Sequence, residues 1–367
     1  MKIALIYLGR RGAGLPISLE LARHLAETDE LLMVLSETAA ASVDWTSLGV
    51  KTLTAITYEN LAQAVWSWID QRRIHRLAEQ IAAWKPDVLL FPMFYTWNPF
   101  LQARLRHIPS VIAVHDPRPH PGLSDKLFQW LENRSIRLAA RGLVFSQSLA
   151  PELARRGISP EKIDTISLGA FDYKYVKSPT GFQSNATEQI APTLLFFGRI
   201  TEYKGLEILL PAFQQVRLHH KVQLLIAGDG DLRPYRPLLE TCEGVEVINR
   251  WVADEEIPEI FQRADMVILP YTSASQSGVI PIAASFGLPV IATCTGGIPE
   301  QIQDGQNGLL IEPGSTEQLV EAIEHLLTDS SIGQGLGQRL RDDFENEHNW
   351  QQTAIIVRDS LLKARLT

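Results

Sequence analysis

In the range Leu194–Glu300 the sequence repeatedly places a short apolar run before a turn that contains glycine or proline, and this arrangement limits the fold more than any other feature. The runs end at Gly198, at Gly228, at Pro270 and shortly before Gly296. Continuous apolar strands separated by helical segments are typical of a parallel sheet covered by helices on both faces. Ligands of such sheets bind at the carboxyl ends of the strands, where these turns lie. The range therefore predicts an α/β domain with a ligand site along one edge of its sheet.

Apolar runs alternate with segments of helical periodicity along the whole chain. Before residue 170 we expect strands at Lys2–Leu8, Leu31–Leu35, Val88–Phe91, Val111–Val114, Leu143–Phe145 and Ile163–Ile166. After residue 192 we expect strands at Leu194–Phe197, Gln223–Ala227, Glu246–Ile248, Met266–Leu269 and Val290–Thr293, and helices at Thr316–Leu327 and Trp350–Leu362. Asp304–Gly308 predicts a hairpin turn.

The length of the chain, 367 residues, suits two domains of roughly 150–200 residues each. Residues 171–192 are rich in turn formers and lack periodicity, as a linker does. We therefore expect an N-terminal domain over residues 1–170, a linker over 171–192, a C-terminal domain over 193–348 and a terminal helix within 349–367.

Composition narrows the classes of function. The net charge of −8 argues against a nucleic-acid partner, because such proteins usually carry a strongly basic domain. The two cysteines, Cys242 and Cys294, have neither metal-ligand spacing nor the pattern of a disulfide framework, so a cytoplasmic location is expected. The apolar run Ile3–Leu8 is too short for a signal-peptide core or a membrane span and reads as a buried strand.

Taken in order, the motifs of the C-terminal half resemble retaining glycosyltransferases of the family-4 type, which have the GT-B fold. The motifs that carry the resemblance are Phe196–Ile200, Tyr203–Gly205, Leu224–Gly230, Ala264–Pro270, Phe286–Thr293 and Gly296–Glu300. The resemblance implies two Rossmann-like, doubly wound parallel-sheet domains that face each other across a cleft. It also implies that the terminal helix packs back on the N-terminal domain.

The resemblance further implies a nucleotide-sugar donor, UDP- or GDP-linked, with no metal or other cofactor. Arg199 and Lys204 match the pair that contacts the donor diphosphate in the family. Cationic side chains and helix N-termini can stabilise a departing diphosphate without a metal. Further donor-binding residues are expected at Gly198, Gly228, Gly230, Arg250 and Trp251. Trp251 either stacks on the base or only packs against its neighbours.

One stretch departs from the family pattern, which places two glutamates between Pro270 and Gly287. An ungapped count puts Ala274 and Ile282 at those two positions. The neutral side chains nearby can hydrogen-bond sugar hydroxyls, and the backbone amides at the start of the next helix can receive a phosphate. The residues expected in these roles are Ser275, Gln276, Ser277, Gly278 and Val279.

In the N-terminal half, His115 ends a predicted strand, and many relatives have a histidine here that touches the donor sugar. Asp116 opens a polar loop suited to an acceptor pocket. The turn after the first strand contains Gly12 and Gly14, which suit close approach of an acceptor-side ligand. Arg10 and its neighbour in this turn either reach an anionic acceptor or are solvated.

Two segments combine aromatic and basic residues, as helices that bind anionic membrane surfaces do. Each is equally well a core helix with a solvated basic face. The first comprises Trp66, Trp68, Arg72, Arg73 and Arg76, and the second Lys126, Leu127–Leu131, Arg134, Arg137 and Arg141.

Together these features predict a retaining, metal-independent glycosyltransferase of the hexosyltransferase type, with His115, Arg199 and Lys204 as catalytic residues. The acceptor is expected to be a glycan, a lipid-linked saccharide or a small molecule, as in polysaccharide biosynthesis. The protein is expected in the cytoplasm or at the inner face of the membrane. Two alternatives stay open: an inactive GT-B relative that binds a partner protein, and another GT-B enzyme such as a nucleotide-sugar epimerase or hydrolase.

Overall fold

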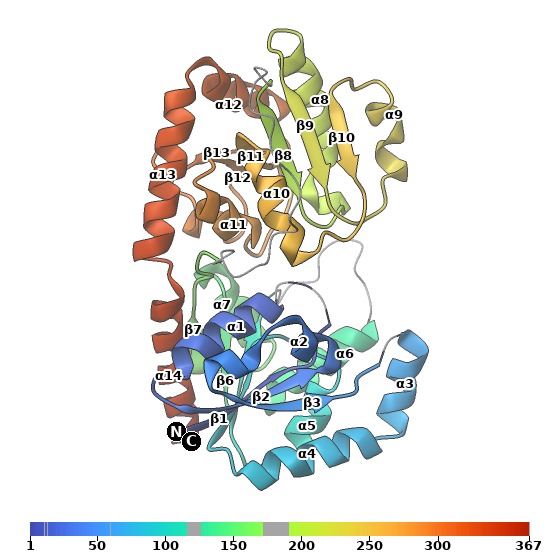
Figure 1. Ribbon diagram of the computed structural model, residues 1–367, viewed down its shortest axis with the longest axis vertical. Coiled ribbons are helices and arrows are strands. Elements are labelled where there is room, and N and C mark those ends of the chain that lie inside the picture. Colours follow the sequence, from blue (N-terminus) through green and yellow to red (C-terminus); the bar gives the residue numbers. More distant parts are fainter. Residues whose placement is uncertain (11, 13, 59, 116–125, 172–190, 367) are drawn as a thin grey trace. The chain divides into compact units, whose positions relative to one another are not determined.

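The computed structural model describes residues 1–10, 12, 14–58, 60–115, 126–171 and 191–366 (Figure 1). The chain divides into two compact units. The first extends to Leu168 and includes Asn349–Thr367, and the second is Gly169–His348. Each unit contains one parallel β-sheet with helices on both faces, so the expected class of two doubly wound α/β domains is confirmed.

The first unit is built on a seven-stranded parallel sheet of order β3-β2-β1-β4-β5-β6-β7. Its strands are β1 (Lys2–Tyr7), β2 (Glu30–Ser36), β3 (Lys51–Ala55), β4 (Val88–Phe91), β5 (Ser110–Val114), β6 (Arg141–Val144) and β7 (Ile163–Thr165). Its helices are α1 (Gly14–Leu25), α2 (Glu37–Ser42), α3 (Leu61–Ile69), α4 (Arg72–Trp84), α5 (Asn98–Arg104), α6 (Lys126–Leu138), α7 (Ala150–Arg155) and α14 (Trp350–Arg365). Strand order reverses between β1 and β4, the arrangement that defines a Rossmann-like sheet.

The second unit repeats this plan with six strands in the order β10-β9-β8-β11-β12-β13. Its strands are β8 (Thr193–Phe197), β9 (Gln223–Ala227), β10 (Val245–Ile248), β11 (Met266–Leu269), β12 (Val290–Thr293) and β13 (Leu309–Ile311). Its helices are α8 (Leu206–Arg217), α9 (Arg236–Leu239), α10 (Ile257–Gln262), α11 (Val279–Phe286), α12 (Thr316–Thr328) and α13 (Ser330–Asn346). The reversal of order falls between β8 and β11.

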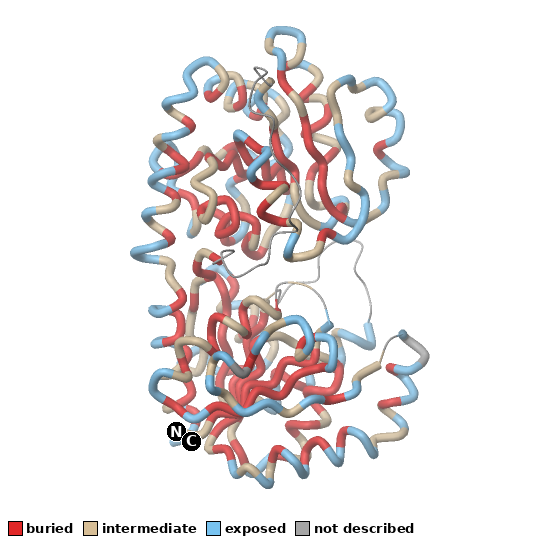
Figure 2. Tube along the Cα trace, viewed as in Figure 1, coloured by how far each residue is buried: buried red, intermediate tan, exposed pale blue. Residues whose placement is uncertain are grey.

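The central strands of both sheets are buried along their whole length, which explains their uninterrupted apolar sequences (Figure 2). In the second unit α8 and α12 pack on one face of the sheet. On the other face Phe261 of α10 stacks against Phe286 of α11, with ring centroids 5.5 Å apart. Burial of apolar surface on both faces is the main source of stability in such a layered domain.

The last helix, α14, belongs to the first unit and packs against α1 and the strands β4 and β5. The Thr353 hydroxyl donates a hydrogen bond to the Ser167 carbonyl at 2.7 Å. Arg358 lies 2.6 Å from the buried carboxylate of Asp29. Burial raises the pKa of Asp29, but hydrogen bonds from Arg358 and the Met1 amino group outweigh this and lower it. Apolar packing and a neutralised buried charge therefore both hold the helix in place.

Three elements were not predicted from the sequence. β3 is largely exposed, so it lacks the apolar run that marks the other strands. α13 contains three glycines, which argue against a helix, yet Gly337 is needed because a Cβ there would lie 2.0 Å from the Gly287 carbonyl oxygen. The expected turn at Asp304–Gly308 forms, with the Gly305 N–H donating to the Gly308 carbonyl at 2.9 Å, but it is not a β-hairpin, because the strand that follows, the unpredicted β13, pairs in parallel with β12.

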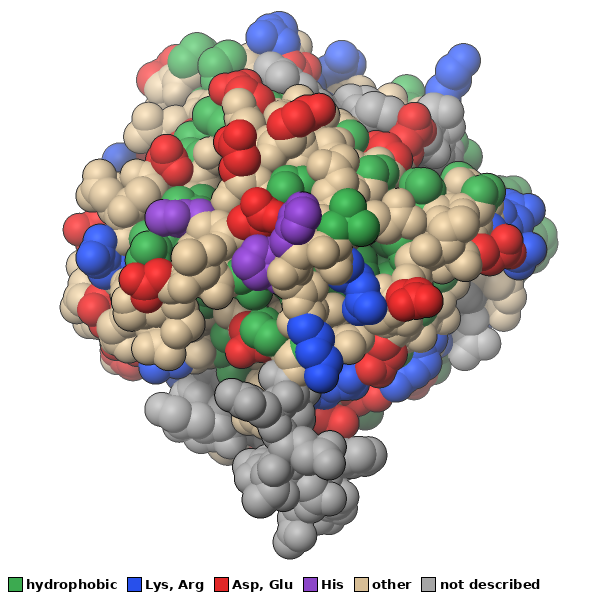
Figure 3. Space-filling model, turned by 90° about the horizontal axis from the view of Figure 1, so that it is seen from above, with side chains coloured by type: hydrophobic (Ala, Val, Ile, Leu, Met, Phe, Trp, Pro, Cys, Tyr) green, Lys and Arg blue, Asp and Glu red, His purple; other side chains and the backbone are tan. Residues whose placement is uncertain are grey.

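Every described helix is too short or too polar to span a bilayer. On the face seen in Figure 3 acidic and basic side chains lie among one another, as on an ordinary solvated surface. The chain's charge is thus dispersed on that face.

The buried Arg141–Asp164 pair offers a test of this packing. The Arg141 guanidinium donates to Asp164 at 2.8 Å and contacts Ser360 of α14 at 3.3 Å. We expect Asp164→Ala to lower the free energy of unfolding by about 2–3 kcal/mol, because it leaves a buried cation without its partner. Urea unfolding of the full chain measures this.

The matched control is Glu30→Ala, which removes the partner of Lys2 in an exposed ion pair with 3.8 Å between the charged atoms. That change should cost about 0.5 kcal/mol or less. Equal costs for the two variants would show that the Arg141 pair contributes no more than a surface contact.

Candidate functional site

The second unit brings four predicted motifs together at the carboxyl ends of β8, β9, β11 and β12. This edge includes the point between β8 and β11 where strand order reverses. Loops on either side of such a reversal diverge and leave a crevice, which is the usual ligand site of open α/β sheets. The motifs that were separate in sequence therefore form one site within this unit.

The loops after β8 and β9 are joined through backbone contacts that only glycine permits. A Cβ on Gly228 would lie 1.8 Å from the Gly198 carbonyl oxygen, and one on Gly230 would lie 2.1 Å from the Ile200 carbonyl oxygen. The Ile200 N–H donates to the Asp229 carbonyl at 2.9 Å. These glycines act first by letting the two loops touch, and the contact fixes the backbone that carries Arg199.

Arg199 follows β8 and is exposed. Within the residues that the structure describes, its guanidinium has no hydrogen bond or ion pair. An arginine that keeps all five of its N–H donors available is suited to binding a phosphate.

Lys204 lies in the same loop and contacts the loop after β11. Its Nζ is 3.6 Å from the centre of the Tyr271 ring and 5.4 Å from that of Tyr203. The Thr272 N–H donates to the Tyr203 carbonyl at 2.8 Å, which ties the two loops together. The ammonium group is thus held over an aromatic face by a cation–π interaction.

Tyr271 is only 1% exposed, and burial raises the pKa of its hydroxyl well above the usual range. The ring therefore stays neutral. Its position is fixed because the Thr293 hydroxyl donates to the Tyr271 carbonyl at 2.6 Å. The contact with a neutral ring orients the lysine and does not itself neutralise its charge.

The loop after β11 is held rigidly by the segment after β12. The Gln301 side chain accepts from the Ser277 N–H at 2.8 Å and donates to the Ser277 carbonyl at 3.1 Å. The Gly297 N–H donates to the Ser275 carbonyl at 3.1 Å. A Cβ on Gly296 would lie 1.5 Å from the Ala274 carbonyl oxygen. The side-chain amide of Gln301 thus pairs with both backbone groups of Ser277, as a neighbouring peptide group would in a sheet.

These hydrogen bonds determine which backbone amides at the start of α11 can still bind a phosphate. The Ser277 N–H is taken by Gln301, and the Val279 N–H donates to the Ser277 hydroxyl at 3.3 Å. Gly278 lies between them, and a Cβ there would meet nothing within 4 Å. Of the three amides expected to receive a phosphate, Gly278 is therefore the one with open space beside it.

The neutral side chains expected to bind sugar hydroxyls lie inside this loop. Ser275, Gln276 and Ser277 are all buried. Ile282, at one of the two positions where the family pattern has glutamate, is also buried and lies in α11. The backbone at Gly278 is therefore more accessible to a ligand than the side chains of Ser275, Gln276 and Ser277.

Arg250 and Trp251 lie in the loop after β10. The Arg250 guanidinium donates two hydrogen bonds to Glu256, at 2.7 and 2.6 Å. This interaction lowers the pKa of Glu256 to about 2. Trp251 is 39% exposed. The hydrogen bonds from Arg250 to Glu256 thus orient the loop, and the indole is the part of this motif open to a ligand.

In the first unit His115 directly follows β5, with its ring centroid 5.6 Å from that of Phe145. Gly12 has a positive φ of 94° and open space beside it, as expected for close approach. Gly14 begins α1, and a Cβ there would lie 2.4 Å from the Tyr7 ring, so packing explains this glycine. Asp116 lies outside the described residues.

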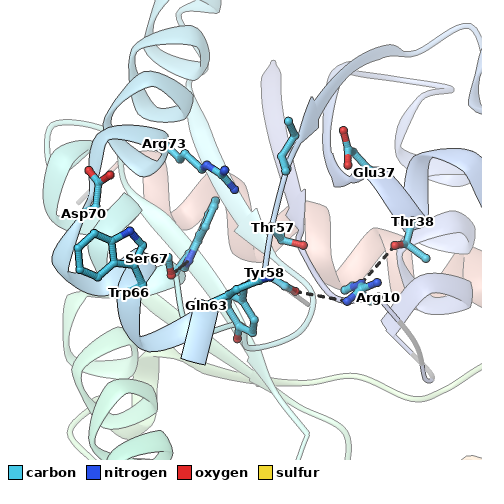
Figure 4. A pocket seen from close by; sticks show the side chains of 12 residues that line it. Arg10, Glu37, Thr38, Thr57, Tyr58, Gln63, Trp66, Ser67, Asp70 and Arg73 are labelled. Atoms are coloured by element: carbon cyan, nitrogen blue, oxygen red, sulfur yellow. Dashed lines mark hydrogen bonds between the residues drawn. The ribbon is translucent and has the colours of Figure 1, made fainter. Parts of the chain in front are cut away.

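The first unit also contains a cavity of about 430 Å³, which we call the first-unit cavity (Figure 4). It lies where β1, β2 and β3 end and where α3 meets α4. Its lining comprises Arg10, Glu37, Thr38, Ile56, Thr57, Tyr58, Gln63, Trp66, Ser67, Asp70, Arg73 and Trp97. Three of these side chains were singled out from the sequence. Arg10 was a candidate contact of an anionic acceptor, and Trp66 and Arg73 belonged to a candidate membrane-binding segment.

The two basic aromatic segments are only partly surface features. On α3 and at the start of α4, Trp66 and the three arginines are exposed, whereas Trp68 packs against the core. On α6 Leu127, Phe128 and Trp130 are exposed. Leu131 and Arg141, expected in the same segment, are buried and belong to the core and to the ion pair with Asp164.

Sequence reasoning missed Tyr271 and Gln301. Tyr271 reads as the end of an apolar strand and Gln301 as a polar residue beyond a turn, and neither carries a local signal. A contact between segments separated by 67 residues, such as Lys204 with Tyr271, is visible only in the folded chain. No group of three or more potential metal ligands occurs within the described part of the chain.

Two protein families match the chain, one in each half. Residues 15–169 match the family described as Glycosyl transferase 4-like domain. Residues 191–329 match the family described as Glycosyl transferases group 1.

Individual proteins are similar over most of the chain. Alpha-D-kanosaminyltransferase of Streptomyces kanamyceticus is 26% identical over 257 residues, which are 65% of this chain and 67% of that protein. The structure of sucrose-phosphate synthase from Thermosynechococcus elongatus superimposes with a TM-score of 0.76 at 18% identity, over 100% of this chain and 98% of that one. That of Anabaena HepE in complex with UDP and glucose gives a TM-score of 0.73 at 17% identity, over 99% and 100%. These structures share the fold of this chain.

Gly205 provides a test of how tightly the site is built. Its φ is +76°, and a Cβ would lie 1.9 Å from the Pro270 carbonyl oxygen. Gly205→Ala should lower the free energy of unfolding by about 3 kcal/mol or more, because the substitution both strains the backbone and separates two loops. Denaturant unfolding monitored by circular dichroism measures the loss.

Gly305→Ala is the matched control, since Gly305 has a similar φ of +68° and nothing within 4 Å of a Cβ. It should cost only about 1 kcal/mol, the cost of left-handed backbone alone. If the two variants lose equal stability, the loops are not in close contact.

Proposed function

We propose that the chain is a glycosyltransferase of GT-B type, and that it is a retaining, metal-independent hexosyltransferase; the matches of its two halves to the glycosyl transferase 4-like and glycosyl transferases group 1 families support this. In this proposal it moves a sugar from a nucleotide-diphosphate donor to a glycan, a lipid-linked saccharide or a small molecule. The structure of HepE with UDP and glucose supports the choice of donor class.

One observation carries the proposal: two cations, Arg199 and Lys204, stand in the loop after β8, at the switch point of the second sheet. Arg199 has no partner among the described residues. Lys204 is held on the neutral Tyr271 ring. A departing nucleoside diphosphate gains negative charge in the transition state, and preorganised positive charge at that position lowers the barrier. This supply of charge makes a metal unnecessary.

We propose roles for three further residues, Gly278, Trp251 and His115. The Gly278 N–H donates a hydrogen bond to a phosphate oxygen at the start of α11, where backbone dipoles favour an anion. Trp251 offers an exposed aromatic face to the base. His115 orients the donor sugar at the reacting carbon. The leaving phosphate accepts the acceptor's proton on the same face, which retains the anomeric configuration.

The apolar surface of the first unit supports peripheral contact with the cytoplasmic face of a membrane. On α3 Val65, Trp66 and Ile69 are 40%, 65% and 70% exposed. Exposed arginines follow at the start of α4. On α6 Trp130 is 56% exposed, with the Arg134 guanidinium 5.8 Å from its ring centre. Exposed aromatic and aliphatic side chains beside cations match an anionic bilayer interface.

A panel of UDP, GDP and ADP with their sugars, monitored by thermal unfolding of the full chain, tests the donor site. A nucleotide at 100 times its dissociation constant should add about 2.7 kcal/mol of stability. With the donor known, Lys204→Ala should lower sugar transfer by roughly 100-fold and leave folding intact, since one transition-state contact is lost.

Lys221→Ala is the control, because Lys221 is exposed in the same unit and lies outside the site. It should transfer at the wild-type rate. Unchanged turnover in Lys204→Ala contradicts the assignment of Lys204. A failure of every nucleotide to bind contradicts the proposed function and favours the partner-binding alternative, whereas donor turnover without any acceptor favours an epimerase or hydrolase.

Membrane contact predicts weaker binding to vesicles of phosphatidylglycerol and phosphatidylcholine when the apolar surface is removed. Ile69→Ser and Trp130→Ser should each lower the partition coefficient about tenfold, because each removes a large apolar side chain from the interface. Cosedimentation with vesicles measures it. Leu218→Ser, at a residue 78% exposed in the second unit, should bind as the wild type does. Equal binding by all variants contradicts the contact.

A further inference from the structure

Gln301 has a fixed position beside the loop that follows β11. It comes directly after the short turn Ile298–Glu300 and lies between Ile298 and Ile302, which are both buried. The N–H groups of Gln301 and Ile302 donate to the Ile298 carbonyl, at 2.9 and 3.0 Å. Because the backbone is held by two buried side chains and two hydrogen bonds, the Gln301 side chain starts from a well-defined point.

This side chain holds the two peptide groups on either side of Ser277. Its amide oxygen accepts from the Ser277 N–H at 2.8 Å, and its Nε2 donates to the Ser277 carbonyl at 3.1 Å. A side-chain amide offers an acceptor and donors on one planar group. A glutamate would lack the donor, and an apolar side chain would lack both. Both of these hydrogen bonds therefore depend on the residue at position 301 being a glutamine.

The bond to the carbonyl also acts on the next residue, Gly278. The Ser277 carbonyl and the Gly278 N–H belong to one peptide group, which is planar and trans. In a trans peptide group the C=O and the N–H point in opposite directions. Because Gln301 holds the carbonyl on its own side, the Gly278 N–H points away from Gln301.

The Gly278 N–H has room for a ligand. A Cβ on Gly278 would meet nothing within 4 Å, and the N–H donates to no other residue that the structure describes. Glycine restricts backbone rotation less than any other residue, so this peptide group could turn over if its carbonyl were not held. A hydrogen bond at the carbonyl also polarises the peptide group and strengthens its N–H as a donor. Gln301 thus orients and strengthens this donor.

We propose that Gln301 is a positioning residue that aims the Gly278 N–H at a phosphate of a nucleoside diphosphate. β8 and β11 are neighbouring strands, so a diphosphate at their ends would meet Arg199 and Lys204 from one loop and this amide from the next. That the diphosphate belongs to a sugar donor rests on the proposed function. The effect of Gln301 on the binding of an anion at Gly278 does not.

NMR of the full chain labelled with ¹⁵N-glycine tests this. The chain has 24 glycines, and the Gly278 resonance is identified by its loss in Gly278→Ala, which a φ of −70° and the open space allow. The probes are UDP, GDP and inorganic pyrophosphate, with uridine and guanosine as nucleosides that lack phosphate. We expect pyrophosphate and at least one nucleotide to shift the Gly278 amide proton, and the nucleosides to leave it unmoved.

Gln301→Met keeps the length of the side chain but has neither hydrogen-bonding group. It should weaken binding of the diphosphate about tenfold, as for one hydrogen bond to a charged acceptor, and remove the Gly278 shift. The affinity for the nucleoside should not change, because the base does not contact this amide. A merely structural role would instead weaken the nucleotide and the nucleoside equally.

Gln318→Met is the matched control. The Gln318 side chain also bonds to backbone in the second unit, accepting from the Glu312 N–H at 2.7 Å, but it is exposed and lies outside the site. This variant should bind and shift as the wild type does. Gln301→Glu keeps the acceptor for the Ser277 N–H and loses only the bond to the carbonyl. It should also remove the Gly278 shift at saturating diphosphate, so the test does not depend on one variant.

Three results would overturn the proposal: a bound diphosphate that leaves the Gly278 resonance unmoved, wild-type diphosphate affinity in Gln301→Met, or equal losses for nucleotide and nucleoside. If a nucleotide binds and one of these results is found, this inference fails alone. If pyrophosphate shifts Gly278 in the wild type but not in Gln301→Met, and no nucleotide binds, the transferase proposal fails and Gln301 remains the positioning residue of an anion site.

Discussion

The donor site depends on backbone-to-backbone contact between loops of the second sheet. At Gly228, Gly230, Gly205 and Gly296 a single added carbon would overlap a carbonyl oxygen of a neighbouring loop, at distances from 1.5 to 2.1 Å. The contacts bring the loops after β8, β9, β11 and β12 into one surface. Because the loops support one another, the positions of the functional side chains follow from the backbone rather than from long side-chain networks.

Two cations of the second unit are positioned by different kinds of contact. Lys204 rests on a buried, neutral tyrosine, whereas Arg250 is paired with a carboxylate. The carboxylate offsets the charge of Arg250, whereas the ring contact does not itself neutralise that of Lys204. In the first unit Arg72 is paired with Asp70, and its neighbour Arg73 faces a cavity. Neighbouring arginines of similar exposure can thus have distinct roles.

Most strands of both sheets could be predicted, because a strand buried on both faces must be continuously apolar, as in Val88–Phe91 and Met266–Leu269. β3 could not, since an edge strand has no such requirement. α13 could not either, because its three glycines argue against a helix, and the close contact of Gly337 with Gly287 at the end of α11 is visible only in the folded chain. Lys204 was predicted from its motif, but its partner Tyr271 was not, because side-chain contacts across a sheet leave no periodic trace in the sequence.

The sequence by itself determined the two α/β domains and the order of the motifs at the second sheet. Hydrophobic periodicity and glycine turns are local properties, so they can be read along the chain. Only the tertiary structure decided which groups remain available to a ligand. It assigned the Ser277 amide to Gln301, Arg250 to Glu256 and Arg141 to the core, and it gathered Arg10, Trp66 and Arg73 around one cavity. The physical reason is that availability depends on which neighbours a side chain meets after folding, and those neighbours come from distant segments.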